Sequence, residues 1–167
     1  MTFDIAKHAH SLSSLPDNWV PSWTVEALWQ THGVNMLFGA PRAHKSTLRD
    51  YLIACAFAQR PALGRFATAA PQKALIVLGE GVVEGESTRF YRILDALGVE
   101  RGALHDRITF LDPLCGIQLD SGPSLKALRA YIEGEGFDFV SFDPLFNLHR
   151  QKENDATAIG IVLQALR

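Results

Sequence analysis

The sequence predicts a single α/β domain built on a mostly parallel sheet, with helices on both faces of the sheet. Short apolar runs alternate four times with segments of helical periodicity along the 167-residue chain. Such alternation is typical of right-handed crossovers between parallel strands. The run at residues 74–78 is wholly apolar, as a strand covered on both faces requires. The length is enough for one ordinary domain and too short for two.

The expected elements follow this alternation in chain order. Residues 1–22 are polar and broken by prolines, so we expect a lead-in segment that packs onto the domain through Trp19 and Trp23. The domain itself is expected to span residues 23–167. The expected strands are residues 34–38, 74–78, 107–111 and 137–142. The expected helices are residues 23–30, 45–59, 86–97, from 121 or 124 to 133, and from 154 or 155 to 167.

Capping residues support several of these helix boundaries. Ser22 is a suitable N-cap for the short first helix, because a serine hydroxyl can accept a hydrogen bond from the first turn. Gly98 follows the third predicted helix, where a glycine readily takes the left-handed conformation of a helix end. Ser121 or Ser124 is expected to cap the next helix in the same way as Ser22.

The composition is that of a globular protein without a strong electrostatic bias. The chain is 47% hydrophobic and 20% charged, and its formal net charge is −2, so no overall basic field draws it toward nucleic acid. Residues 1–8 do not resemble a signal peptide, and no apolar run reaches the ~20 residues of a membrane helix. Cys55 and Cys115 are expected to be free, buried thiols of a cytoplasmic protein.

The residues between the first predicted strand and the next helix predict a phosphate-binding loop. Gly39 supplies a sharp turn after the apolar run, Lys45 places an ammonium group at the helix start, and Ser46 supplies a hydroxyl that can bind Mg²⁺. A cation in the first turn opposes the helix dipole by up to ~1 kcal/mol, and a bound polyphosphate removes this conflict. The expected nucleotide-binding residues are Gly39, Ala40, Pro41, Arg42, Ala43, His44, Lys45, Ser46 and Thr47.

One position departs from the usual pattern Gly-x-x-x-x-Gly-Lys-Ser/Thr, because His44 stands where the second glycine belongs. A side chain here would crowd the phosphates, shift the loop, or donate a hydrogen bond to phosphate; it could equally point to solvent. The alternative explanation is an ordinary Gly-Pro turn that leads into a helix, with Lys45 merely exposed.

Two acidic residues at strand ends support the nucleotide site. Asp143 directly follows the fourth predicted strand, where a carboxylate can orient water or Ser46 around Mg²⁺. Glu80 follows the second predicted strand, where it can polarise the water that attacks a γ-phosphate. Ligands of parallel sheets bind at the carboxyl ends of the strands, so both acids are expected beside the loop. The alternatives are a turn-forming aspartate before a proline and a solvated loop glutamate.

Three stretches resemble the AAA-family ATPases related to RepA-type hexameric helicases, within the RecA-like superfamily. They are FGAPRAHKSTL at residues 38–48, ALIVLGEG at 74–81, and FDPLFNLHR at 142–150 followed by Glu-Asn-Asp at 153–155. The resemblance extends from about Trp19 to Arg167, and such proteins are frequent in phages, prophages and plasmids. A bulky residue before the lysine resembles a known variant of this group.

The resemblance implies a three-layer P-loop NTPase core of the RecA type, with ATP and Mg²⁺ as ligands. It assigns phosphate and Mg²⁺ to Lys45 and Ser46, the Walker B role to Asp143 and the catalytic glutamate to Glu80, with Lys45 also serving catalysis. It further implies ATP hydrolysis coupled to single-stranded DNA, in replication, recombination or repair, by a hexameric ring. Related cores continue into a strand with a polar sensor residue, so we expect this sequence to be truncated at its C-terminus.

Two other functions remain open from the sequence. One is a nucleotide-binding or interaction module with little turnover, and the other is a P-loop phosphotransferase. The phosphotransferase is disfavoured because no arginine-rich lid follows Asp143. Arg89 and Arg92 are expected to lie on a solvated helix face, and no arginine finger can be assigned.

Overall fold

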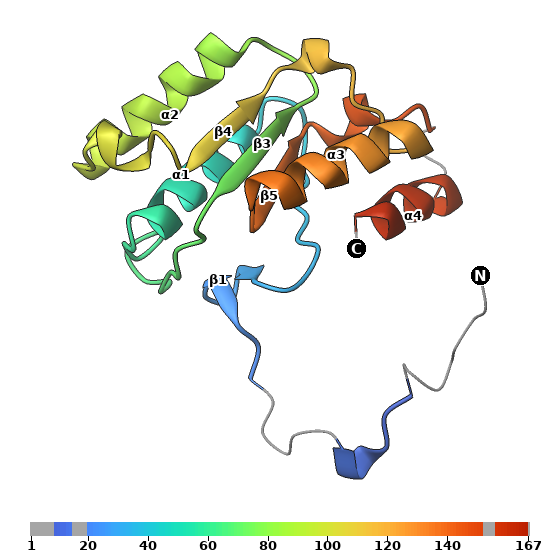
Figure 1. Cartoon of the computed structure of the whole chain (residues 1–167). Helices are drawn as coiled ribbons and strands as arrows, with labels where there is room; N and C mark the ends of the chain where they lie inside the picture. The colour runs from blue at the N-terminus through green and yellow to red at the C-terminus, as the bar shows by residue number, and fades with distance from the viewer. Residues whose placement is uncertain (1–8, 15–19, 152–155, 167) are drawn as a thin grey trace.

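The domain is built around a parallel sheet whose strands come from the predicted apolar runs. The computed structural model describes residues 9–14, 20–151 and 156–166 (Figure 1). Within these residues, β3 (Ala74–Leu78) lies between β4 (Ile108–Leu111) and β5 (Phe139–Asp143), and it pairs with both in parallel. The predicted strands at 74–78, 107–111 and 137–142 are therefore confirmed within two residues at each end.

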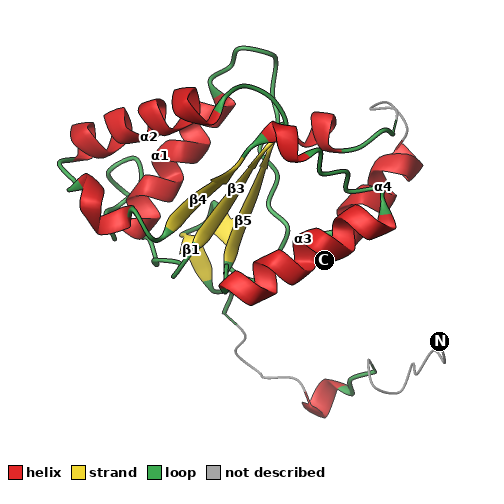
Figure 2. Ribbon diagram, turned by 45° about the horizontal axis from the view of Figure 1, so that its top comes forward, coloured by secondary structure: helices red, strands yellow, loops and turns green. Residues whose placement is uncertain are grey.

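Helices cover both faces of this sheet, as the sequence predicts. On one face lie α1 (Lys45–Phe57) and α2 (Val83–Leu97), and on the other lie α3 (Gly122–Glu135) and α4 (Ala156–Ala165) (Figure 2). The side chains of β3 alternate between the two layers. Ala74, Ile76 and Leu78 pack with α1 and α2, whereas Leu75 and Val77 pack with α3 and α4, and all five are buried. This alternation gives the sheet two separate cores, one on each face.

The predicted helix at residues 23–30 is wrong, because this segment forms an antiparallel hairpin. Its strands are β1 (Trp23–Val25) and β2 (Trp29–Gln30), joined by a turn in which Ala27 has a φ of 56°. Aromatic and β-branched residues favour a strand here. Val25 is completely buried against α1, and the backbone NH of Glu26 donates to the carbonyl of Ala67. These non-local contacts outweigh the helical spacing seen in the sequence.

The predicted first strand at residues 34–38 is also wrong, because the segment forms irregular backbone outside the sheet. Asn35 ties its start to the hairpin: its side chain accepts a hydrogen bond from the NH of Gln30 at 3.0 Å and donates to the carbonyl of Gln30 at 2.9 Å. Because residues 34–38 do not pair with β5, their apolar side chains stay accessible to solvent, and Phe38 is 84% exposed. The described sheet thus has three strands where the sequence predicts four.

The remaining helix boundaries agree with the sequence apart from small shifts. α2 begins at Val83, three residues before the predicted start, and its first turn carries Glu84 and Glu86, which favour a helix N-terminus. Gly98 ends α2 in the left-handed conformation, as predicted. Ser121 precedes α3 but makes no side-chain capping bond, while the Ser124 hydroxyl accepts from the NH of Gln118.

Short 3-10 turns complete the described elements, at Leu12–Ser14, Arg101–Leu104, Pro113–Cys115 and Leu145–Leu148. The expected packing of Trp19 and the expected start of the last helix at Asn154 or Asp155 lie outside the described residues. Both cysteines are free, as predicted, although Cys55 is buried and Cys115 is exposed rather than buried. In the part of the chain that the structure describes, no helix has the length and apolar character to cross a membrane.

Candidate nucleotide site

The two acids singled out in the sequence lie at the same edge of the sheet. Asp143 is the last residue of β5 and pairs in register with Leu78, the last residue of β3. The NH of Gly79 donates to the carbonyl of Asp143 at 2.8 Å, which extends the pairing by one residue. Glu80 is the next residue after Gly79 in the sequence. The expectation that Glu80 and Asp143 occupy neighbouring strand ends is therefore confirmed.

The predicted phosphate loop precedes α1, and its lysine is the first residue of that helix. Residues 39–44 form an exposed turn, closed by a hydrogen bond from the NH of Ala43 to the carbonyl of Ala40 at 3.3 Å. The ammonium group of Lys45 donates to the carbonyls of Gly39 and Ala40, both at 2.9 Å. The loop therefore wraps around its own ammonium group, and Ser46 and Thr47 follow in the first turn of α1.

The backbone of His44 explains why the usual pattern has a glycine at this position. His44 is the N-cap of α1 and has φ 55° and ψ 30°, the left-handed conformation. This region costs an L-residue about 1–2 kcal/mol, and glycine enters it freely. Histidine is among the residues that tolerate it best after glycine. His44 therefore holds a backbone conformation that a glycine at this position would adopt without strain.

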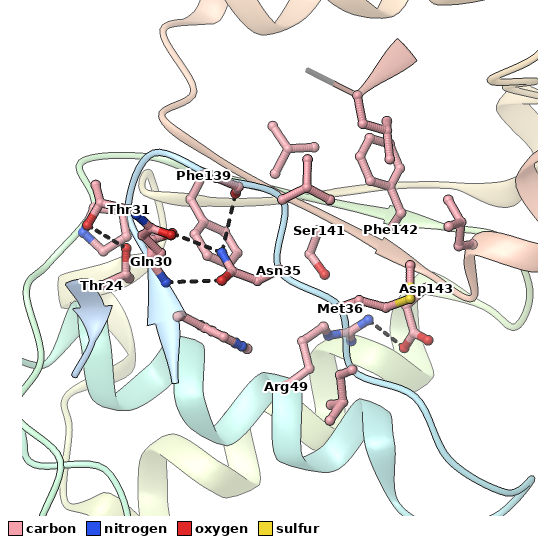
Figure 3. Close-up of a pocket in the computed structure, with 18 of the residues that line it drawn as sticks. Thr24, Gln30, Thr31, Asn35, Met36, Arg49, Phe139, Ser141, Phe142 and Asp143 are labelled. Atoms are coloured by element: carbon pink, nitrogen blue, oxygen red, sulfur yellow. Dashed lines mark hydrogen bonds and ion pairs between the residues drawn. The ribbon is translucent and has the colours of Figure 1, made fainter. Parts of the chain in front are cut away.

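A cavity of about 470 Å³ lies between residues 34–37 and β5, along the edge of β5 that does not pair with β3 (Figure 3). Lys45, Arg49 and Asp143 all line it. Figure 3 shows the Arg49 guanidinium pointing toward the Asp143 carboxylate at one end of the cavity. Neither Ser46 nor Glu80 lines this cavity. Lys45 and Asp143 therefore line the same cavity, whereas Glu80 lies outside it.

A network of charged side chains from α1 and α2 binds the Asp143 carboxylate. The Nη1 atom of Arg49 donates to Oδ2 of Asp143 at 2.5 Å, and its Nη2 atom donates to Oδ1 of Asp50 at 2.6 Å. Arg89 of α2 bonds to Asp50 and Glu86. The Asp50 side chain is completely buried. Burial raises the pKa of the Asp50 carboxyl, while both arginines act to lower it. The network joins α1 and α2 to the end of β5.

This network corrects the expectation that Arg89 belongs to a solvated face. Its side chain is 29% exposed and bonds Asp50 through Nε at 2.7 Å, whereas Arg92 on the same helix is exposed, as predicted. Sequence reasoning also missed Arg49. The adjacent opposite charges Arg49 and Asp50, close to the apolar run at residues 52–57, were the available signal, because such a pair is rarely buried without partners.

Glu80 has a partner that the sequence did not indicate. The Nδ2 atom of Asn147 donates to Oε2 of Glu80 at 3.0 Å. Asn147 lies in the 3-10 turn Leu145–Leu148, which follows β5. The two residues are 67 positions apart, and their spacing in the sequence does not predict the contact. It arises because β3 and β5 are neighbours and end at the same edge.

Two side chains have the donor chemistry that a magnesium ion arriving with a nucleotide would need, although Ser46 lies outside the cavity that Asp143 lines. Mg²⁺ usually keeps several waters and takes one or two protein oxygens together with phosphate oxygens. Asp143 and Ser46 supply one carboxylate and one hydroxyl of this kind. Among the described residues there is no group of three or more His, Cys, Asp or Glu that could hold a metal without such a ligand.

Taken together, the parallel sheet with helices on both faces and the lysine-bearing loop before α1 fit a P-loop-like α/β fold. A family model described as the AAA domain matches residues 14–167. The chain therefore belongs to the AAA domain family, whose activity is nucleotide binding and ATP hydrolysis. No curated protein and no solved structure matches the chain.

Proposed function

We propose that this chain is an Mg²⁺-dependent ATPase that binds ATP at the loop of residues 39–47. The observation that carries the proposal is that Lys45 and Asp143 line one cavity, while Glu80 follows the neighbouring strand end. Lys45 would exchange its two carbonyl partners for phosphate oxygens, which accept stronger, charge-assisted hydrogen bonds. Ser46 and Asp143 would hold Mg²⁺, which neutralises phosphate charge when bound.

Glu80 is the residue proposed to activate water. It is exposed and accepts a hydrogen bond from an uncharged amide, and none of the ion pairs within the part of the chain that the structure describes involves its carboxylate. Asp143 differs, because it is ion-paired with Arg49. A carboxylate that is free of a cation can accept a proton from water, whereas one that is paired with a guanidinium is better suited to orient ligands. This difference supports the division of roles between the two acids.

We extend the proposal to a RepA-type assembly, in which a ring of chains couples hydrolysis to single-stranded DNA in replication, recombination or repair. The support is the resemblance of residues 38–48, 74–81 and 142–155 to that group. Because the net charge is −2, DNA binding would depend on a local patch or on the assembled ring.

A second candidate function, a nucleotide-binding module with little turnover, also has structural support. Lys45 is held by its own loop, and Asp143 is held by Arg49 at 2.5 Å. Both groups must change partners before they can contact phosphate and Mg²⁺. A chain that binds ATP without hydrolysing it would leave one of these exchanges incomplete.

The test begins with binding of a fluorescent ATP analogue in Mg²⁺ by the wild type, Lys45→Ala and the control Lys126→Ala, an exposed lysine of α3. We expect Lys45→Ala to weaken binding about 100-fold, since it removes a charge-assisted contact to phosphate, and Lys126→Ala to bind normally. Wild-type protein that fails to bind millimolar Mg²⁺-ATP would refute the proposed site.

Phosphate release with and without single-stranded DNA then separates the two functions. DNA-stimulated turnover, together with a ring in sedimentation experiments with ATP, supports the helicase-type ATPase. Binding without turnover in either condition favours the module, and in that case Glu80→Gln would change neither binding nor phosphate release.

A further inference from the structure

Asn147 reaches Glu80 because the backbone of β5 and its following turn passes unusually close to Gly79. A Cβ atom placed on Gly79 would lie 2.7 Å from the carbonyl oxygen of Pro144 and 3.0 Å from the Cβ of Asn147. The first distance is shorter than real Cβ contacts and the second is at the tight limit, so this close approach favours glycine. The turn Leu145–Leu148 therefore packs directly on the end of β3, one residue before Glu80.

The turn is also fixed from its other side. Leu148 is buried in the core formed with α3 and α4, and its carbonyl accepts a hydrogen bond from the NH of Leu119 at 2.7 Å. Phe146, on the opposite side of Asn147 in sequence, is 53% exposed. Asn147 thus projects from an anchored segment, and the position of its amide is set by the packing of Gly79 and Leu148.

We propose that Asn147 is a positioning residue for the water-activating carboxylate of Glu80. This inference rests on the proposed ATPase function and adds to it a residue outside the phosphate loop and the Walker acids. The amide donates to Oε2 of Glu80 at 3.0 Å and carries no charge. It therefore fixes the carboxylate without neutralising it, unlike the guanidinium that holds Asp143.

The chemistry of the step explains why orientation matters. A water proton passes to Oε1 of Glu80 while the water oxygen forms a bond to the γ-phosphorus. The bond between that phosphorus and the β,γ-bridging oxygen breaks, and ADP leaves with the bonding electron pair. Rotation of the carboxylate moves Oε1 away from the water, and misplacement of a reacting group by about 1 Å costs on the order of 100-fold in rate. A hydrogen bond to Oε2 opposes that rotation.

The decisive variant is Asn147→Asp, which keeps the shape of the side chain, removes both donors and places a second carboxylate against Glu80. We expect kcat to fall about 10- to 100-fold, while KM for ATP stays within about twofold, because the interaction acts on water activation and not on ATP binding. Asn147→Ser, which retains a donor on a shorter side chain, should recover part of kcat. Phe146→Ala, at the exposed neighbour in the same turn, controls for general disturbance of the turn.

A second measurement does not depend on turnover. We expect Asn147→Asp to weaken the binding of ADP–aluminium fluoride, which mimics the transferring phosphoryl group with its attacking water, about tenfold more than the binding of ATP. In a Glu80→Gln background, Asn147→Asp should have no further effect on kcat or on analogue binding, because its target is already changed.

The outcomes separate the two proposals. If Glu80→Gln abolishes turnover or analogue binding and Asn147→Asp leaves both unchanged, Asn147 has no positioning role and the ATPase proposal stands. Equal losses in ATP and analogue binding, or equal losses in Phe146→Ala, would show that Asn147 only supports the turn. Wild-type turnover and analogue binding that are unaffected by Glu80→Gln would instead refute the role proposed for Glu80, and with it the inference.

Discussion

Arg49 and Asp143 form a short ion pair, with 2.5 Å between Nη1 and Oδ2. The same guanidinium contacts Asp50, whose side chain is completely buried, and Glu86. One side chain therefore contacts three carboxylates, among them Asp50 in the interior and Asp143 at the edge of the candidate site. Substitution of Arg49 affects the stability of the domain as well as the site.

We predict that Arg49→Met lowers the free energy of unfolding by about 3 kcal/mol, because it leaves a buried carboxylate without one of its partners. Urea denaturation measures this loss. Arg101→Met is the control: it breaks an ion pair with Asp95 in which both side chains are 51% exposed, and should change stability little. Equal effects of the two substitutions would show that the buried network contributes no more than a surface pair.

The loss in Arg49→Met should grow with pH. Burial raises the pKa of the Asp50 carboxyl, and Arg49 is the first of the groups that oppose this effect. Without Arg49 that pKa rises further above its unfolded value. A carboxyl with a raised folded-state pKa stabilises the fold below its unfolded pKa and loses this contribution as the pH rises through the folded pKa. Denaturation at pH 5 and pH 8 tests the direction, and a smaller loss at pH 8 would contradict it.

The left-handed backbone of His44 predicts opposite effects for two substitutions. His44→Gly relieves a conformation that costs an L-residue about 1–2 kcal/mol, partly offset by the entropy of glycine, whereas His44→Val adds a β-branched side chain that this region disfavours. We expect the free energies of unfolding of the two variants to differ by more than about 1 kcal/mol, with His44→Gly the more stable. The same substitutions at Ala43 are the control, and an equal difference there would contradict this explanation.

Two glycines predict opposite results for the same change to alanine. At Gly79 the new Cβ would meet the carbonyl oxygen of Pro144 at 2.7 Å, so Gly79→Ala should destabilise the domain and lower kcat through displacement of Asn147. At Gly134, inside α3, nothing lies within 4 Å of a new Cβ, and the change should stabilise the helix by about 0.5–1 kcal/mol. Thermal denaturation and phosphate release test both. A neutral Gly79→Ala would mean that the turn can move away without cost.

The two thiols should differ strongly in reactivity. Cys55 is completely buried, and burial raises the pKa of its thiol, which lowers the fraction of reactive thiolate. Cys115 is exposed in the turn after β4. We expect a disulfide reagent at pH 8 to modify Cys115 rapidly and Cys55 only after unfolding. Cys115→Ser should remove the fast phase, and a fast phase that persists in this variant would contradict the assignment.

Sequence patterns predicted those parts of the fold whose signals are local. The wholly apolar run of β3, the glycine that ends α2 and the lysine that begins α1 all behave as expected, since each depends on a few neighbouring residues. The adjacency of Glu80 and Asp143 was also predictable, because parallel strands end at a common edge.

Features that depend on distant partners were not predictable in the same way. The apolar run at residues 34–38 satisfies the pattern of a strand, but a strand also needs a backbone partner, and here the Asn35 side chain is bonded to Gln30 of the hairpin instead. The hairpin itself is held by backbone contacts to residues 67–69. Likewise, Asn147 can bond to Glu80 only because the turn after β5 packs closely against Gly79. The spacing of residues in the sequence does not predict this packing.

The contacts of Lys45 have a consequence for ligand discrimination. Its ammonium group already has two oxygen partners, the carbonyls of Gly39 and Ala40. A neutral nucleoside brings no acceptor stronger than these, whereas a di- or triphosphate brings several anionic oxygens. On the proposed function, an uncharged analogue would therefore compete poorly with these carbonyls for the ammonium group. We expect the loop to select phosphorylated over unphosphorylated ligands before any contact with the base contributes to selection.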